Sequence, residues 1–197
     1  MKEQWKQHVA EVLREIGIAD GHYVLDCCCG KGIYAAAAAT LVGDSGRIYA
    51  IDSDSGRLKE LKQEADSCRF CNIQIIEKDV ESSIPLPDSS VDFVLLYDIF
   101  WYFRPTEKKT ENLLREVRRV ARPNAVISVF PTHVDTGSLL RFKNEMKNIG
   151  FLLVSEFSRE LVHEQHLETG RLLNYRKVQH DQRERKAARR GQSSAKP

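Results

Sequence analysis

The feature that most constrains the fold is an alternation of short apolar runs with amphipathic segments. Strands are predicted over 23–28, 47–52, 73–77, 91–97 and 125–130, and helices over 33–42, 55–67, 113–120 and 139–146. The run from Val91 to Tyr97 is expected to be buried on both faces, as in the centre of a parallel sheet. Strands that alternate with helices imply right-handed crossovers, so the sequence predicts a doubly wound α/β sheet with helices on both faces.

The ends of the chain add three elements and a charged tail. Apolar residues from Trp5 to Ile16 recur at helical spacing, and two last strands are expected over 151–157 and 170–177, joined by a polar segment. A length of 197 residues fits one domain over 1–177. Residues 178–197 contain six Lys and Arg against two Asp and Glu. We expect this segment to be a basic, disordered tail, with an arm for nucleic acid or an acidic partner as the alternative.

Composition excludes several classes of protein. With 42% hydrophobic and 29% charged residues the chain is expected to fold rather than stay disordered. No apolar run approaches the ~20 residues of a membrane helix, and the N-terminus has no apolar core of a signal peptide, so we expect a soluble, cytoplasmic protein. The five cysteines are interpreted as reduced thiols.

The cysteines also raise the question of a metal. Cys68 and Cys71 have ligand spacing, and with Cys27 to Cys29 they suggest a zinc site. Packing as small apolar side chains is the preferred interpretation of all five, so no metal site is predicted.

Polar residues and glycines gather where the predicted strands end. In doubly wound sheets ligands bind at the carboxyl ends of the strands. This edge is expected to carry 26–32, 52, 79, 98–103 and 131–135.

The first turn and the second strand suggest an adenosine-containing cofactor. Gly30-Lys31-Gly32 lets the backbone approach a ligand, and Asp52 stands where a carboxylate can accept both ribose hydroxyls. The spacing also matches dinucleotide binders. Asp26, however, would repel a pyrophosphate and could hold a cationic amino acid group, which favours S-adenosylmethionine.

These motifs resemble the class I S-adenosylmethionine-dependent methyltransferases, and the resemblance covers roughly 9–177. Val24 to Gly32 is similar to the first motif of that family, and Ile48 to Asp52 to the second. The stretch from Ile84 to Val94 closely resembles the Leu-Pro-Phe-Pro-Asp-x-Ser-Phe-Asp-x-Val run of the branch that contains ubiquinone and menaquinone methyltransferases. Leu114 to Pro123 is similar to the helix and turn that follow in that branch.

The resemblance implies a Rossmann-like, seven-stranded sheet of order 3-2-1-4-5-7-6 with the last strand antiparallel. It implies S-adenosylmethionine as cofactor, with S-adenosylhomocysteine as product. The positions that match the family's cofactor-binding residues are Asp26, Cys28, Gly30, Gly32, Asp52, Ser53, Asp79, Val80 and Asp98.

Three departures from the family pattern are visible. Cys28 stands at the place of the first glycine, and Asn124-Ala125 replaces a glycine pair, where asparagine tolerates positive φ. Trp101-Tyr102 replaces two histidines that many relatives carry, which affects the expected substrate more than the fold.

The expected reaction is in-line methyl transfer to a small, partly apolar acceptor, in which alignment of the reactants is the main contribution. Candidate catalytic residues are Asp98, Tyr102 and His133, and the substrate pocket is expected to contain Trp5, Phe100, Trp101 and Tyr102. The alternatives are an RNA or other nucleic-acid methyltransferase that uses the basic tail, a non-catalytic cofactor-binding protein and, last, a nicotinamide dehydrogenase. No sequence feature sets the oligomeric state.

Overall fold

The computed structural model describes residues 3–80, 83–101, 104, 107–163 and 166–178. A seven-stranded sheet has the order β3-β2-β1-β4-β5-β7-β6, as the family resemblance implied. Its strands are β1 (Tyr23–Cys27), β2 (Arg47–Asp52), β3 (Ile73–Glu77), β4 (Val91–Tyr97), β5 (Ala121–Phe130), β6 (Phe151–His163) and β7 (His166–Lys177). The first five strands in this order, β3, β2, β1, β4 and β5, are all parallel to their neighbours. Strand β7 runs antiparallel to both β5 and β6.

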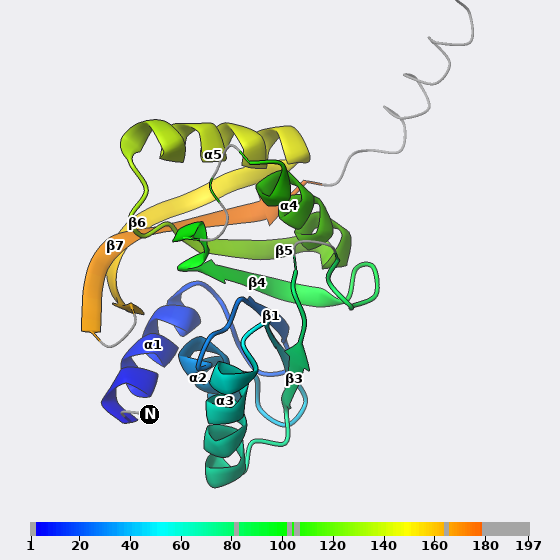
Figure 1. Cartoon of the computed structure of the whole chain (residues 1–197), viewed down its shortest axis with the longest axis vertical. Helices are drawn as coiled ribbons and strands as arrows, with labels where there is room; N and C mark the ends of the chain where they lie inside the picture. The colour runs from blue at the N-terminus through cyan, green and yellow to red at the C-terminus, as the bar shows by residue number, and fades with distance from the viewer. Residues whose placement is uncertain (1–2, 81–82, 102–103, 105–106, 164–165, 179–197) are drawn as a thin grey trace, which may run out of the picture.

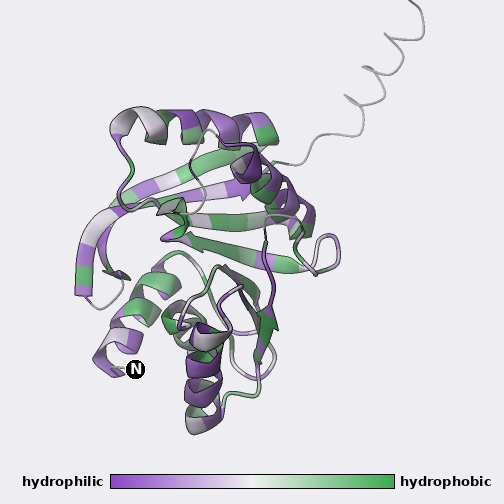
Figure 2. Ribbon diagram, in the orientation of Figure 1, coloured by the Kyte–Doolittle hydropathy of each residue, from purple (hydrophilic) through white to green (hydrophobic). Residues whose placement is uncertain are grey.

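Helices cover both faces of the sheet (Figure 1). The helices are α1 (Glu3–Glu15), α2 (Ile33–Val42), α3 (Ser55–Cys68), α4 (Lys108–Val120) and α5 (Thr136–Ile149), with a short 3₁₀ turn, η1 (Ile99–Trp101). Apolar side chains of α1, α2 and α3 form one core layer, and those of α4 and α5 form the other. Figure 2 shows β4 and β5 as largely hydrophobic strands between the layers, which confirms the predicted central position of β4.

The last hairpin differs from the prediction. The segment expected to be a polar connection continues both strands, so β6 reaches His163 and β7 begins at His166. Polar residues are stable in this extension because it packs against the first two helices. The Tyr34 hydroxyl donates to the Val162 carbonyl at 2.6 Å, and Arg159 forms an ion pair with Glu15.

The hairpin also extends past the end of its neighbour. Val129 of β5 pairs with Leu173, and β7 runs antiparallel, so the residues that precede Leu173 continue past the carboxyl end of β5. A Cβ atom on Gly170 would lie 2.5 Å from the Phe130 ring, so glycine is needed where the two strands separate. The tip of this hairpin therefore lies at the edge where the parallel strands end (Figure 1).

The connection between α4 and β5 is also shorter than expected. The sequence predicts a turn at Arg122 to Asn124, whereas β5 starts at Ala121, directly after α4. A bulge between β4 and β5 accommodates the extra residues, and Arg122 reaches Asp92 at 2.7 Å. Asn124 adopts a φ of 67°, which confirms that it takes the conformation of a glycine.

The cysteines are free thiols, as predicted. Cys27 and Cys29 are buried, but Cys68 and Cys71 are exposed, so the packing explanation is wrong for these two. In the described part of the chain, no helix combines the length and apolar character that crossing a membrane requires.

Candidate cofactor and acceptor site

The turn from Cys28 to Gly32, here called the cofactor loop, links β1 to α2 in a tightly constrained backbone. Cys28, Gly30 and Gly32 all have positive φ, of 61°, 55° and 76°. The amide of Gly32 donates to the Cys29 carbonyl at 2.9 Å. A Cβ atom on Gly32 would lie 2.3 Å from the Leu61 side chain, so α2 and α3 can approach only because this residue is glycine.

Asp52, at the end of β2, is joined to the cofactor loop. One of its carboxylate oxygens accepts from the Gly30 amide at 2.7 Å and the other from the Asp54 amide at 2.9 Å. The side chain is buried, with 9% of the residue exposed. Each oxygen retains a second lone pair, so the carboxylate can still accept from a pair of ligand hydroxyls.

Asp26, in β1, is a buried acid with one carboxyl oxygen that accepts no hydrogen bond from the described residues. It is 2% exposed, and its Oδ2 atom has no hydrogen-bond partner among the described residues. Burial raises the pKa of Asp26 to about 7, the nearby Asp52 carboxylate adds to the rise, and a hydrogen bond from the Ala35 amide opposes it. A cation would relieve the cost of ionising this carboxyl, so the residues fit the ammonium group of S-adenosylmethionine better than a pyrophosphate.

The remaining predicted cofactor residues lie along the same edge. Ser53 is exposed directly after β2, and Asp79 is exposed two residues after the end of β3. Val80 is 3% exposed and packs in the core with Cys27 and other residues. Their contacts with a cofactor stay predictions.

A polar cluster follows β4 and β5. We call Asp98, Thr132, His133, His163 and Glu168 the Asp98 cluster. Asp98 has a φ of 56° and accepts from the Thr132 hydroxyl at 2.6 Å, while its second oxygen lies 2.9 Å from Nδ1 of His163. The Nε2 atoms of His163 and His133 are 3.2 Å apart, and Glu168 Oε2 lies 3.7 Å from His133 Nε2. The cluster therefore joins two loop residues of the sheet edge to the hairpin.

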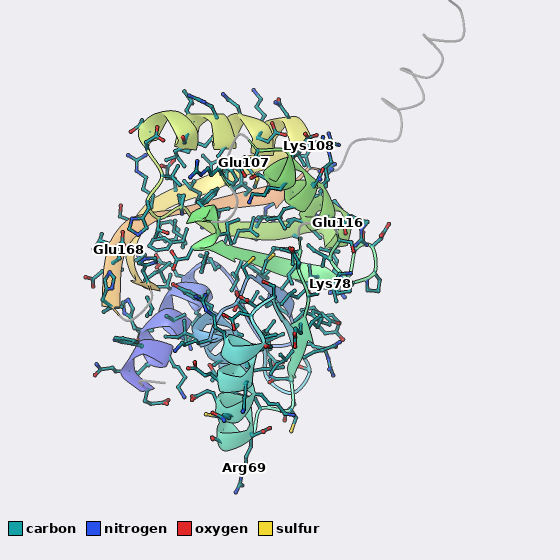
Figure 3. All side chains as sticks on the ribbon, viewed as in Figure 1. Arg69, Lys78, Glu107, Lys108, Glu116 and Glu168 are labelled. Atoms are coloured by element: carbon teal, nitrogen blue, oxygen red, sulfur yellow. The ribbon has the colours of Figure 1, made fainter. Side chains whose placement is uncertain are left out.

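Sequence reasoning identified only part of this cluster. Asp98 and His133 are predicted candidates, and Thr132 lies in a loop that was expected at the edge. His163 and Glu168 were not foreseen, because they belong to the segment interpreted as a connection. Figure 3 labels Glu168 on the hairpin, on the opposite side of the view from Lys78, which follows β3. The segment interpreted as a connection is mostly polar, and the apolar pair Leu161-Val162 within it is the sequence feature that indicates a longer strand.

Tyr34 is in the first turn of α2, directly after the cofactor loop, and its hydroxyl bonds to Val162, the residue before His163. Burial raises the pKa of its hydroxyl well above the usual range, and the carboxylates of Asp98 and Asp26 add to the rise. Its ring contacts Tyr97 edge to face, with centroids 4.7 Å apart. The two carboxylates are thus close enough to act on the same buried hydroxyl, and we treat the cofactor loop and the Asp98 cluster as parts of one site.

The predicted aromatic pocket is only partly described. Phe100 is 7% exposed and packs edge to face on Phe142 at 4.9 Å, so its ring belongs to the core below the edge. Trp5 is half-buried against the layer formed by α1 and α2. Tyr102 lies outside the described residues, as does the side chain of Trp101.

Comparison with known sequences identifies one family and several relatives. Residues 24–124 match a family described as "Methyltransferase domain". A demethylmenaquinone methyltransferase from Geobacillus kaustophilus is 28% identical over 133 residues, which cover 68% of this chain and 53% of that protein. The chain therefore spans about half the length of the curated relatives it matches.

Solved structures match over most of the chain. A SAM dependent methyltransferase from Aquifex aeolicus superposes with a TM-score of 0.70 and 22% identity, covering 86% of this chain and 89% of that one. A putative sarcosine dimethylglycine methyltransferase from Galdieria sulphuraria gives 0.67 and 16%, covering 89% and 86%. At these identities the likeness concerns the fold alone, and it agrees with the observed strand order.

Proposed function

Because the chain belongs to the methyltransferase domain family, we propose that it transfers a methyl group from S-adenosylmethionine to a small, partly apolar acceptor by in-line displacement. The observation that carries the proposal is the unpartnered Oδ2 of buried Asp26 beside the cofactor loop. A carboxylate in this position matches the ammonium group of the cofactor. It disfavours a dinucleotide, whose pyrophosphate would lie next to a buried negative charge.

The cofactor loop, Asp52 and Asp26 would bind the cofactor, and the Asp98 cluster would face the acceptor. Asp52 would accept from the ribose hydroxyls while it holds the cofactor loop through the Gly30 amide. Asp26 would bind the ammonium group. When bound, S-adenosylmethionine supplies an activated methyl group, so the protein needs mainly to orient the acceptor and exclude water. The hairpin that extends past β5 is positioned to help exclude water on that side.

The acceptor would lie against the Asp98 cluster, with Trp101 and Tyr102 as its predicted aromatic walls. The cluster offers two imidazoles and two carboxylates that can bind or orient a polar atom of the acceptor. Curated relatives named demethylmenaquinone methyltransferase support a hydroquinone as the first acceptor to test. The cytoplasmic location expected from the sequence stays a prediction.

A nucleic-acid acceptor is the second candidate, and the charge of residues 178–197 is the observation that favours it. Six basic residues in that segment would neutralise phosphates, and such contacts make binding strongly dependent on salt.

A methyl-acceptor screen tests the proposal. The full chain is incubated with S-adenosylmethionine labelled in the methyl group and with a hydroquinone, a phenol, an amine or transfer RNA. We expect label in one of the small acceptors, and loss of that transfer in Asp52→Ala. Label in RNA alone, lost at moderate salt, would establish the second candidate instead. Cofactor binding with no transfer to any acceptor class would favour a non-catalytic binding protein.

A further inference from the structure

Three side chains of the Asp98 cluster are arranged as ligands of a metal ion. His133, His163 and Glu168 each present one ligand atom, and these atoms all lie within 4.8 Å of one another. The side chains come from three places: the loop after β5, the end of β6 and the start of β7. They come together only when the hairpin of β6 and β7 folds beside the loop after β5. For this reason the sequence predicts no metal here.

The separation of the two imidazole nitrogens fits a common ion. Bonds of about 2.05 Å from zinc to imidazole nitrogen, at tetrahedral angles, place two ligand atoms about 3.3 Å apart. The two Nε2 atoms are 3.2 Å apart, and Glu168 Oε2 lies 3.7 Å from His133 Nε2. All three ligand atoms lie within 4.8 Å of one another, so the partly exposed Glu168 side chain must rotate toward the two imidazoles to complete the site.

The environment of His163 prepares it for coordination. This residue is 6% exposed, and its Nδ1 atom lies 2.9 Å from Oδ2 of Asp98. Asp98 is in turn fixed by the Thr132 hydroxyl at 2.6 Å. At this distance the two groups form an ion-pair contact but not an aligned hydrogen bond, so a small rotation of the imidazole ring is needed before Nδ1 can donate to the carboxylate. A carboxylate that accepts from Nδ1 holds the proton on that nitrogen and leaves the lone pair of Nε2 for a metal ion. Histidines that bind metals in proteins are commonly oriented by a carboxylate in this way.

We propose that His133, His163 and Glu168 bind one divalent transition-metal ion of the zinc type, with Asp98 orienting His163. Two imidazoles and a carboxylate suit such an ion and leave at least one coordination position open. That position would take an oxygen atom of the methyl acceptor, and this second part rests on the proposed function. Acceptors with an acidic hydroxyl or a carboxylate would then be preferred over purely apolar ones.

Metal binding can be measured without any turnover. The full chain, without a polyhistidine tag and with Cys68→Ser and Cys71→Ser to remove the exposed thiols, is titrated with Zn²⁺ by calorimetry and with Co²⁺ by absorption. We expect one ion per chain at about micromolar affinity or tighter, and a Co²⁺ spectrum of nitrogen and oxygen ligands. His133→Ala and Glu168→Gln change partly exposed side chains, so both variants should fold, and each should lose at least about tenfold in affinity.

Two further variants sharpen the measurement. Asp98→Asn should weaken metal binding by about 10- to 100-fold although it changes no ligand. His8→Ala removes a histidine that contacts the Glu160 carbonyl and should bind the ion like the parent protein. If the parent chain binds no stoichiometric ion, or if His133→Ala and Glu168→Gln bind as tightly as His8→Ala, the two imidazoles share only a hydrogen bond and the proposal fails.

The acceptor part has its own readout. Removal of the ion with a chelator should raise the KM for an identified acceptor at least about tenfold and leave the affinity for S-adenosylhomocysteine unchanged. An unchanged KM would overturn the acceptor role and leave the metal site standing. Failure to bind S-adenosylhomocysteine at all would instead contradict the proposed function, whatever the result with metal.

Discussion

Replacing Asp26 by asparagine should separate the stability of the protein from its function. Because the pKa of Asp26 is raised to about 7 by burial, the folded chain holds a proton on this carboxyl that the unfolded chain, with an ordinary aspartate, releases near pH 4. As the pH rises between these values, the free energy of unfolding of the native protein falls by about 1.4 kcal/mol per pH unit on account of this group. Above pH 7 both states are ionised and the loss is complete.

Asparagine is uncharged at every pH, so the variant avoids this loss. The free energy of unfolding of Asp26→Asn, minus that of the native protein, should therefore rise by about 2 to 3 kcal/mol between pH 5 and pH 8. Urea unfolding at pH 5, 6, 7 and 8 measures this difference. Asp44→Asn, in the exposed loop between α2 and β2, makes the same substitution at the surface and is the matched control.

The same substitution should harm ligand binding. At pH 8 Asp26→Asn is expected to bind S-adenosylhomocysteine at least about tenfold more weakly, because a charge-assisted contact with the ammonium group is lost. For the native protein, affinity should increase as the pH rises through about 7, since only the ionised carboxyl attracts the cation. A stability difference that does not change with pH would refute the inference about the buried acid. Greater stability with undiminished binding would refute its role toward the cofactor.

Two further predictions concern the cofactor loop and the tail. Gly32→Ala combines a φ of 76° with a Cβ atom 2.3 Å from Leu61, and should lower the free energy of unfolding by about 2 to 4 kcal/mol in urea titrations. Gly30→Ala is its control: it shares the positive φ, but its Cβ would meet nothing closer than 3.8 Å, so a loss of only about 1 kcal/mol is expected. Truncation after Val178, whose amide donates to the Gly150 carbonyl at 3.1 Å, should leave the melting temperature and cofactor affinity unchanged. A drop of several degrees would show that the tail contributes to the fold.

The sequence predicts the parallel part of the fold well because its signals are local. Runs such as Val91 to Tyr97 are apolar enough to identify a buried strand, and Asp52 and Gly32 are recognisable from their spacing after strands. The strand order itself came from the family resemblance, since pairing between distant strands leaves no local trace.

The hairpin was missed for a physical reason. Polar residues such as Arg159 and Glu160 are found as readily in a connection as in an exposed strand, and the partners that stabilise them, Glu15 and His8, lie in the first helix. Contacts between residues so far apart in the chain cannot be read from a window of sequence. The half of the site that depends on the hairpin, with His163 at its centre, was therefore beyond sequence reasoning.

The central claim is that the edge formed by β1 and β2 binds S-adenosylmethionine, and calorimetric titration of the full chain with S-adenosylhomocysteine and with NAD⁺ tests it most directly. We predict that one S-adenosylhomocysteine binds per chain at about micromolar affinity, near −8 kcal/mol. Asp52→Ala should weaken this binding by about 1.5–3 kcal/mol, because the ribose hydroxyls of the ligand would lose the carboxylate that accepts from them. NAD⁺ should bind much more weakly. Tighter binding of NAD⁺ than of S-adenosylhomocysteine, or unchanged affinity in Asp52→Ala, would contradict the account.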